Sequence, residues 1–600
     1  MKKWHLSIIV LFNLLVMSLV SQAAGALQIS YTVSFPEAQA HYADIEMEIK
    51  GLAQNKLDLK LPVWTPGSYL VREFSKNVES FTAQSGGKPV NVVKTRKNIW
   101  QLNTQGLSSV KVKYRFYAFE ISVRTAFIDV THAFLSTSGM FFYPDGGLNL
   151  PSTIKIIPYK GWDKVSTSLA KVGNDAFTVT APNYDILYDS PIEVGNQDVF
   201  GFKAAGVDYE VAMYGGGNYD KERLKKDMAK IVEEQTAIYG ENPNKRYVFI
   251  VLNYLKGGGG IEHLSSTVLG AARDAYATEA GYEGFLGLVA HEHFHLWNVK
   301  RLRPIALGPF DYDNENYTTN LWIAEGFTAY YDNLTVRRTN LFPVDHYLKA
   351  LAADFNIVDN TPGTKVQPLS QASFDAWIKS YRPDENTINT SISYYNKGSV
   401  VAMLMDLEII NDTKGARSLD DVMRYMYNEY YKVKKRGYTD AEFKAGVEKF
   451  AGKNLDDFYA KYINGVDDID YNKYLGYAGY KLVDEYEGLN APDLGIRTIT
   501  VAGTGKLKVA AVLRGTSGWV DGINVNDELV SIDGVPATDP KTLIEGKQVG
   551  DKIQVIVLRD GRPLTLPVTL LKVTLKKYHI ESLAEPTSSQ MTVRKKWLKI

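Results

Sequence analysis

The chain has 600 residues, which is too many for one hydrophobic core, because single cores stop growing at roughly 250–300 residues. It contains 68 basic residues, 68 acidic residues and no cysteine, which excludes disulfides, thiolate metal sites and a global basic field for nucleic acid. We therefore expect a multidomain protein without a nucleic-acid partner, in which any transition metal is bound by His, Asp or Glu. The periodicities described next predict that its fold class is α+β.

The N-terminus has the pattern of an export signal. Two lysines precede a 15-residue apolar run from Leu6 to Val20, and small residues follow. A helix of that length spans about 22 Å, which is shorter than the roughly 30 Å hydrocarbon core of a membrane. We predict a cleaved signal peptide over residues 1–26 and a mature chain that is periplasmic or secreted and has no stable membrane insertion.

Apolar residues alternate with polar ones along residues 27–207, which is the pattern of half-buried strands. The clearest alternating positions are Leu27, Ile29, Tyr31, Val33 and Phe35, then Leu57, Leu59, Leu61 and Val63, then Val110, Val112, Tyr114 and Phe116. Gly, Pro and Asn turns separate these runs. The pattern predicts an N-terminal antiparallel β-sandwich.

The periodicity changes after the glycines at 215–217. Apolar residues then follow helical spacing as far as Ile238, a strand is expected over 247–252, and the chain is mainly helical from 282 to 468. We predict an α/β and then mainly α domain over residues 208–470.

Short apolar runs separated by turn dipeptides return near Tyr480 and continue to Val573. This pattern predicts a small β-rich domain over residues 471–580. The basic tail, residues 581–600, is expected to be a solvated end.

The strongest chemical motif is His-Glu-x-x-His at His291, Glu292 and His295, at the end of an apolar helical face. Residues four apart on a helix differ by about 40°, so the two imidazoles lie side by side and can bind one ion. Glu292 can then take a proton from water at the ion's open position as general base. His293 points away and is expected to have a structural or supporting role. The alternative for the bare motif is a chance match on an amphipathic helix.

A catalytic zinc keeps three protein ligands and one exchangeable position. Glu325 is the best third candidate, because it lies within an apolar helical stretch where a carboxylate would be costly to bury without a cation. We therefore expect one Zn²⁺ per chain, bound by His291, His295 and Glu325.

Two further motifs fit peptide chemistry. Gly258, Gly259 and Gly260 permit close approach of an extended peptide to an edge strand, and Glu262 follows them, where it could pair with a substrate's free α-amino group. A flexible loop is the alternative for the glycines alone. Downstream, a tyrosine hydroxyl in the Tyr394-Tyr395 pair could donate to an oxyanion.

In this order the motifs resemble the gluzincin metallopeptidases. The strings HEHFHLWNVKRLRP at residues 291–304 and WTPGSYL at 64–70 more specifically resemble the glycyl aminopeptidase family. The resemblance implies an N-terminal β domain, a thermolysin-like catalytic domain and a C-terminal PDZ domain. It makes His291, His295 and Glu325 the zinc ligands, as the residues themselves suggest, and Glu292 the catalytic base.

The same resemblance places Glu262 in the exopeptidase motif that binds the substrate's amino end, and Tyr395 at the oxyanion position, with Tyr394 as the competing choice. His263 stands where related aminopeptidases have Asn. A longer segment separates the second and third zinc ligands here, and its residues 301–317 are expected to form a loop near the cleft. In the C-terminal domain, PDLGI at residues 492–496 resembles the carboxylate-binding loop of PDZ domains.

Together these features predict a zinc aminopeptidase that acts on peptides with a free N-terminus and, by family resemblance, prefers small first residues such as Gly or Ala. One alternative is a zinc endopeptidase or broader hydrolase with the same site. The other is a periplasmic peptide-binding protein that works through the PDZ groove, which could also take a C-terminal peptide in the enzyme.

Overall fold

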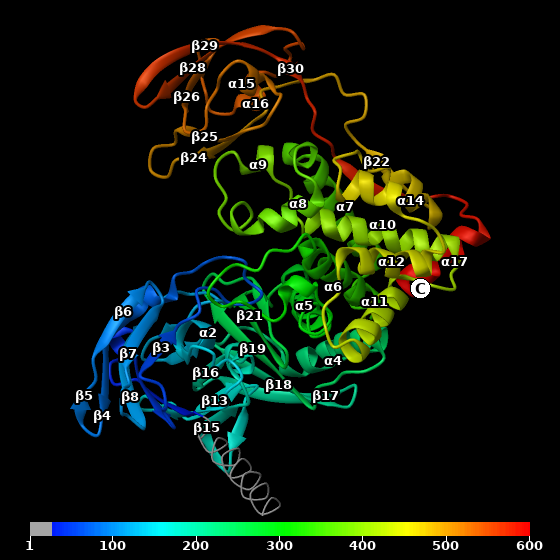
Figure 1. Cartoon of the computed structure of the whole chain (residues 1–600). Coiled ribbons are helices and arrows are strands. Elements are labelled where there is room, and N and C mark those ends of the chain that lie inside the picture. The colour runs from blue at the N-terminus through cyan, green and yellow to red at the C-terminus, as the bar shows by residue number, and fades with distance from the viewer. Residues whose placement is uncertain (1–26) are drawn as a thin grey trace, which may run out of the picture. The chain divides into compact units, whose positions relative to one another are not determined.

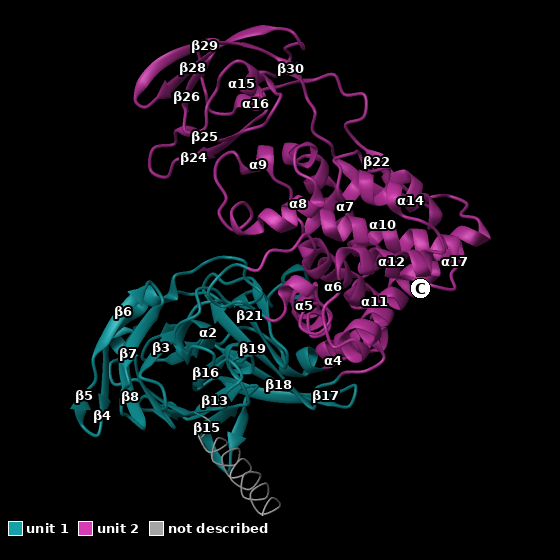
Figure 2. Cartoon of the chain, in the orientation of Figure 1, with its two compact units in different colours: residues 1–225, 243–285, 310–315 teal, residues 226–242, 286–309, 316–600 magenta. Residues whose placement is uncertain are grey.

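The computed structural model describes residues 27–600, so the predicted signal peptide lies outside the described residues (Figure 1). Within those residues, no helix combines the length and the apolar character that crossing a membrane requires. The chain divides into two units, coloured separately in Figure 2. Unit 1 comprises the described residues up to Lys225 together with residues 243–285 and 310–315, and unit 2 comprises residues 226–242, 286–309 and 316–600.

An eight-stranded sheet is the largest element of unit 1, with the strand order β14-β15-β12-β1-β2-β8-β4-β5. Its strands are β1 (Gln28–Ser34), β2 (Tyr42–Lys50), β4 (Val78–Ser85), β5 (Lys88–Pro89), β8 (Ser109–Tyr117), β12 (Ser152–Ile157), β14 (Ala170–Val172) and β15 (Asp175–Ala181). The predicted alternation is confirmed, since every second residue of β8 from Val110 to Phe116 is buried.

Two four-stranded sheets share a hydrophobic core with the large sheet. One has the order β13 (Lys164–Thr167), β16 (Ile192–Gly195), β10 (His132–Leu135) and β9 (Phe127–Ile128). The other has the order β11 (Tyr143–Pro144), β3 (Lys56–Lys60), β7 (Ile99–Asn103) and β6 (Val92–Arg96). The short helices α2 (Thr137–Met140) and α3 (Tyr184–Tyr188) complete this region. The predicted N-terminal β-rich domain is confirmed.

The prediction that this region is wholly antiparallel is wrong at one pair, because β1 and β12 are parallel, with Tyr31 opposite Ile154. A parallel pair requires a long crossover connection, and the chain forms ten other strands between these two before it returns beside β1. Alternation within each strand cannot reveal such a return.

Unit 1 also contains a five-stranded sheet with the order β17 (Asp198–Ala204), β18 (Val207–Tyr214), β19 (Arg246–Tyr254), β21 (Ser266–Ala272) and β20 (Gly260–Glu262). β17 and β18 form an antiparallel pair, so the predicted domain boundary at 207/208 is wrong and this sheet begins at Asp198. The strand expected over 247–252 is β19, which is central in this sheet and cannot be the edge that an extended peptide would join. The edge strand is instead β20, which ends at Glu262.

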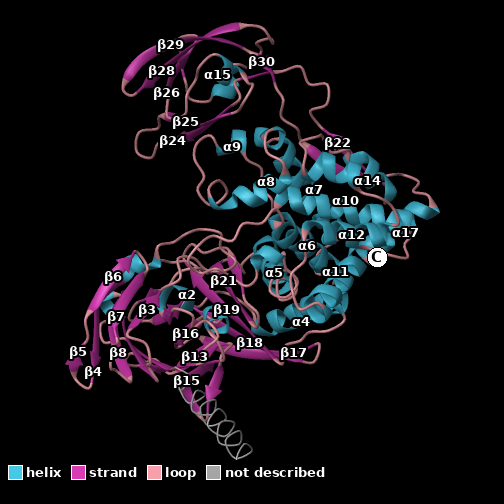
Figure 3. Ribbon diagram, in the orientation of Figure 1, coloured by secondary structure: helices cyan, strands magenta, loops and turns pink. Residues whose placement is uncertain are grey.

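Helices form most of unit 2 (Figure 3). α4 (Lys221–Tyr239) and α5 (Glu279–Phe294) each begin in unit 1 and continue into unit 2. The other long helices are α6 (Phe327–Arg338), α7 (Val344–Asp359), α10 (Asn396–Asp412), α11 (Leu419–Met426) and α12 (Asp440–Ala451), with α14 (Tyr471–Tyr477) after them. The region predicted to be mainly helical, residues 282–468, is confirmed. It contains α6, α7, α10, α11 and α12 together with the π-helical turn η7 (Tyr427–Val433).

A small β module follows the helices. Its sheet has the order β24 (Ile496–Thr500), β25 (Leu507–Val512), β26 (Glu528–Ile532), β28 (Lys552–Arg559) and β29 (Arg562–Thr569), and β23 (Pro492–Asp493) pairs with β30 (Leu571–Lys572). Its own core runs from Leu494 to Leu570. The predicted span of 471–580 is too wide, because α14 and the pair β22 (Tyr480–Asp484) and β31 (Tyr578–Ser582) contact the helices α10 and α7.

The prediction of a solvated basic end is wrong. Residues Ser588–Leu598 form helix α17, in which Trp597 is fully buried and its Nε1 donates to the hydroxyl of Tyr330 at 2.9 Å. Arg594 is also buried and donates to the carbonyl of Ala478 at 2.8 Å. The basic residues of this segment suggested a solvated end, but the helix also contains apolar residues and packs against α10 and α6.

Candidate metal centre and active site

The His-Glu-x-x-His motif lies at the end of α5, as predicted. His291 is in the last turn of the helix, and His295 follows its last residue, with the His295 amide donating to the His291 carbonyl at 3.4 Å. This bond continues the helical path for one residue. As a result the Nε2 atoms of the two imidazoles are 3.2 Å apart.

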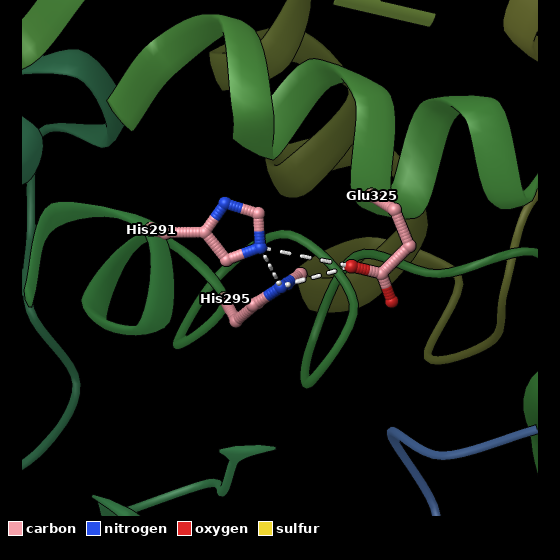
Figure 4. A group of neighbouring side chains, drawn as sticks. All are labelled: His291, His295 and Glu325. Carbon is pink, nitrogen blue, oxygen red and sulfur yellow. Dashed lines mark hydrogen bonds and ion pairs between the residues drawn. The ribbon is translucent and has the colours of Figure 1, made fainter. Parts of the chain in front are cut away.

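Glu325 completes a three-residue group with the two histidines (Figure 4). It lies in a π-helical turn, η4 (Trp322–Gly326), directly before α6, and is 2% exposed. Its Oε2 is 3.3 Å from Nε2 of His295 and 3.8 Å from Nε2 of His291. Single π-helical turns occur frequently at functional sites.

A glycine contact sets the position of this turn. A Cβ atom on Gly326 would lie 2.5 Å from the Cα of Gly398, and a Cβ atom on Gly398 would lie 2.9 Å from the Cα of Gly326. Neither residue can have a side chain, so the turn after Glu325 and the first turn of α10 meet at their backbones. The same contact brings Tyr394 and Tyr395, which precede α10, next to the turn that carries Glu325.

Each histidine is oriented through its other ring nitrogen. Nδ1 of His291 lies 3.0 Å from Oδ2 of Asp332, and Nδ1 of His295 lies 2.8 Å from the carbonyl of Asn298. A proton on each Nδ1 leaves each Nε2 as the free acceptor that a metal requires. The Asn298 side chain also donates to the carbonyl of Ala324 at 3.1 Å, which connects the second histidine to the turn of Glu325.

The carboxylate of Glu325 carries a negative charge although it is buried. Burial acts to raise the pKa of Glu325, but His295 and His291 outweigh it, and the pKa lies at about 2. The carboxylate is therefore ionised. A buried anion between two imidazole nitrogens is the environment that a divalent cation would neutralise.

His293 points away from this group, as predicted. It is fully buried, and its Nδ1 lies 2.7 Å from Oε1 of Gln235, whose own Nε2 donates to the Ala290 carbonyl at 2.7 Å. Burial lowers the pKa of His293 to about 3, so it is neutral. Its role is to tie α5 to α4.

Glu292 and Tyr395 lie beside the three-residue group. Glu292 is 4% exposed, and one of its carboxylate oxygens lies within 4.8 Å of a ring nitrogen of His295. The ring of Tyr395 is stacked on that of His291 with centroids 6.3 Å apart, whereas Tyr394 is fully buried behind it, 4.8 Å from the Tyr395 ring.

The glycine-rich motif belongs to unit 1. Gly260 and Glu262 are in the edge strand β20, and Nη2 of Arg124 donates to the Gly260 carbonyl at 3.0 Å. Gly259 has φ of +76°, and a Cβ atom built on Gly258 would meet nothing within 4 Å. Of the glycines at 257–260, only Gly260 lies in the strand, and the other three form a loop before it.

The Glu262 side chain is almost fully buried, with 4% exposure, yet its carboxylate has no hydrogen-bond or ion-pair partner among residues 27–600. The next residue, His263, has its Nδ1 3.0 Å from Oδ1 of Asp189, and Oδ2 of Asp189 accepts from the Leu264 amide at 2.7 Å. Asp189 thereby fixes the chain immediately after Glu262.

The insertion over residues 301–317 is a loop with one 3₁₀ turn, η3 (Ile305–Leu307), as expected. Part of it, residues 310–315, belongs to unit 1. There Asp313 accepts from Lys60 at 2.9 Å, and the Asp311 carbonyl accepts from Nε1 of Trp64 at 2.7 Å. The loop thus holds the WTPGSYL segment.

Sequence reasoning missed Asp332, Asn298 and Gln235, which orient the three histidines of the motif. Asp332 lies seven positions after Glu325 and therefore on the same helical face, which is a signal that the sequence contains. The other two contacts depend on the tertiary fold.

Known proteins resemble this chain in sequence and in fold. Residues 30–196 match the Peptidase M61 N-terminal domain, and residues 284–401 match the M61 glycyl aminopeptidase domain. The fold is similar to the crystal structure of an aminopeptidase N family protein from Idiomarina loihiensis, with 27% identity, 95% of this chain and 100% of that chain covered, and a TM-score of 0.88. An M1 zinc metallopeptidase from Deinococcus radiodurans is more distant, at 13% identity over 71% of this chain and 90% of that one, with a TM-score of 0.45. No curated protein matches the sequence.

The fold and the site therefore define a metallopeptidase. More particularly, two segments of the chain match the models of the M61 N-terminal domain and of the M61 glycyl aminopeptidase domain.

Proposed function

We propose that this protein is a zinc aminopeptidase that removes the first residue of peptides with a free N-terminus. The observation that carries the metal assignment is the spacing of the three donor atoms. Zinc binds imidazole nitrogens and carboxylate oxygens at about 2.0–2.2 Å in a tetrahedral arrangement, so its ligand atoms are roughly 3.3 Å from one another. The three distances here are 3.2, 3.3 and 3.8 Å. His291, His295 and Glu325 would therefore hold one Zn²⁺ per chain.

When bound, zinc would act as a Lewis acid on the scissile carbonyl and would make water a stronger acid. Glu292 then acts as general base: it takes the proton of the attacking water and passes it to the leaving amine.

The hydroxyl of Tyr395 donates a hydrogen bond to the oxyanion that forms on the scissile carbonyl. Tyr395 is a better candidate than Tyr394, because its ring is stacked on His291 and is partly exposed, whereas Tyr394 is fully buried.

Glu262 binds the α-amino group of the substrate. Its carboxylate is buried and has no partner within the described chain, which is costly unless a cation completes the site. A protonated amine would supply that cation, and Gly258, Gly259 and Gly260 would let the substrate backbone approach the edge strand. By family resemblance, we propose a preference for small first residues, Gly or Ala.

Three further assignments complete the proposal. Residues 1–26 act as a signal peptide, so the enzyme works in the periplasm or outside the cell. The module around residues 492–572 is a PDZ domain, and the loop at residues 492–496 would receive a C-terminal peptide.

The test is the hydrolysis of one glycine-initiated peptide with its amine free and with it acetylated, by zinc-loaded protein, with Glu292→Gln as the inactive control. Cleavage of the free peptide alone supports the aminopeptidase. Equal cleavage of both peptides supports the endopeptidase alternative, and cleavage of neither, with tight binding of C-terminal peptides, supports the peptide-binding alternative.

A further inference from the structure

The segment Trp64–Leu70 contains a glycine in close contact with the proposed amine-binding carboxylate. Gly67 has φ of +88°, and a Cβ atom built on it would lie 2.6 Å from Oε2, 2.8 Å from Oε1 and 2.9 Å from Cδ of Glu262. Real Cβ atoms almost never approach other atoms so closely. The carboxylate of Glu262 therefore lies against the bare Cα of Gly67, in the space that any other residue would fill.

The loop around Gly67 has a fixed backbone. The Ser68 amide donates to the Thr65 carbonyl at 3.1 Å, and the Arg72 amide donates to the Val63 carbonyl at 2.8 Å. Trp64 is fully buried, and its Nε1 donates to the Asp311 carbonyl at 2.7 Å. The loop cannot withdraw from Glu262 without breaking these bonds.

The strand that carries Glu262 is fixed as well. Arg124 donates to the Gly260 carbonyl on one side of it, and Asp189 binds His263 and Leu264 on the other. With both backbones held, a side chain at position 67 could be accommodated only if the carboxylate moved.

We propose that Gly67 is a positioning and specificity-determining residue: by lacking a side chain, it sets where the Glu262 carboxylate lies and hence where the substrate's α-amino group is bound. The inference rests on the amine-binding role of Glu262 under Proposed function. Residues 310–315 then have a supporting role, because their hydrogen bonds fix the position of the segment that contains Gly67.

The experiment compares Gly67→Ala with Gly161→Ala. Gly161 has φ of +90° and nothing within 4 Å of a built Cβ, so it reproduces the backbone strain without the contact. Both variants are assayed on a glycine-initiated tripeptide with a free amine and on its acetylated form. Binding of the free tripeptide is also measured by calorimetry in the Glu292→Gln background, which does not depend on turnover.

We expect Gly67→Ala to weaken binding and to raise KM for the free tripeptide about 10- to 100-fold, the range of one lost hydrogen bond to a charged group, with a smaller change in kcat. Gly161→Ala should match the unaltered protein. Glu262→Asp shortens the side chain and should remove its steric conflict with a methyl group at position 67. The KM and the binding affinity of Gly67→Ala/Glu262→Asp should therefore lie within a few-fold of those of Glu262→Asp alone.

The inference is overturned if Gly67→Ala behaves like Gly161→Ala, or if the effects of Gly67→Ala and Glu262→Asp simply multiply. If Gly67→Ala does not fold, the folding of Gly67→Ala/Glu262→Asp is measured instead. A folded double variant supports steric conflict between position 67 and the Glu262 carboxylate. If neither variant folds, the backbone conformation alone requires the glycine and the inference is overturned. Equal cleavage of free and acetylated tripeptide by the unaltered protein would reject the amine-binding role itself, and this inference with it.

Discussion

Glu325 and Asp332 lie seven positions apart on one continuous helical path and approach the same imidazole from two sides. Oε2 of Glu325 is 3.8 Å from Nε2 of His291, and Oδ2 of Asp332 is 3.0 Å from Nδ1 of the same ring. Seven residues make nearly two helical turns, so both carboxylates share a face. One helix thereby supplies a metal-ligand candidate and the group that orients another.

Removal of Asp332 should therefore weaken metal binding without removing a ligand. We expect Asp332→Ala to lower zinc affinity about 10- to 100-fold, because supporting partners of metal-binding histidines have effects of that size. Asp332→Asn should have a smaller effect, since its amide oxygen can still accept from Nδ1. Competition with a chelator measures both, and Asp345→Asn, at an exposed site on the next helix, is the control. Equal affinities in all four proteins would contradict this role.

Replacement of Glu292, the proposed general base, should stop turnover without preventing zinc from binding. We expect Glu292→Gln to lower kcat by about 10²–10⁴-fold, the range of general acid–base catalysis. The amide has nearly the same shape, so zinc content should stay at one per chain. Kinetics together with metal analysis of the same sample check this. If the variant loses zinc, Glu292 contributes to binding the metal instead.

Substitution of each of the two adjacent tyrosines by phenylalanine should have a different effect. Tyr395→Phe removes the proposed oxyanion donor and should lower kcat about 10²–10³-fold with little change in KM. Tyr394→Phe removes a hydroxyl from a fully buried ring and should change thermal stability more than kcat. Steady-state kinetics and unfolding curves of both variants are the measurement. The reverse pattern would make Tyr394 the donor.

The sequence was sufficient to predict the parts of the site that follow from local periodicity. The four-residue spacing of His291 and His295 follows from helix geometry, and the apolar neighbours of Glu325 indicated a buried carboxylate. Both are confirmed as neighbours in space. His293 is likewise on the opposite side of the helix, as its spacing predicts.

Features that depend on long-range pairing could not be predicted in the same way. The parallel pairing of β1 with β12 joins segments more than a hundred residues apart, and no local pattern distinguishes it from antiparallel pairing. The contact between Gly67 and Glu262 could not be predicted either, because it depends on how a loop packs against a strand about 200 residues further along the chain. The helix α17 was missed for a different reason, since four apolar residues among lysines resemble a solvated segment.

That C-terminal helix should be essential to the stability of the helical region. Trp597 is fully buried, its ring centroid lies 5.7 Å from that of Tyr347, and its Nε1 donates to Tyr330. We expect Trp597→Ala to lower the free energy of unfolding by about 3–5 kcal/mol. Trp519→Ala, at a site that is 42% exposed, should cost less than about 1 kcal/mol. Circular dichroism in denaturant measures both, and similar losses would contradict the packing described for α17.

Lys397 gives the stability a distinct dependence on pH. Its side chain is 1% exposed, its Nζ has no hydrogen-bond partner in the part of the chain that is described, and burial, together with Lys365, lowers its pKa from 10.5 to about 8. Between pH 8 and 10.5 the unfolded chain binds more protons at this group than the folded chain, so the contribution of this group to folding stability rises with pH across that window.

Lys397→Met keeps the volume and removes the charge. We expect the variant to be more stable than the unaltered protein at pH 7 by a few kcal/mol, since each unit of pKa shift corresponds to about 1.4 kcal/mol. The difference should shrink as the pH rises from 8 and vanish near 10.5, where the lysine is neutral in both states. Unfolding of both proteins at pH 7, 9 and 10.5 checks the trend. A difference that stays constant with pH would show that the amine is paired with an anion or water in the folded protein.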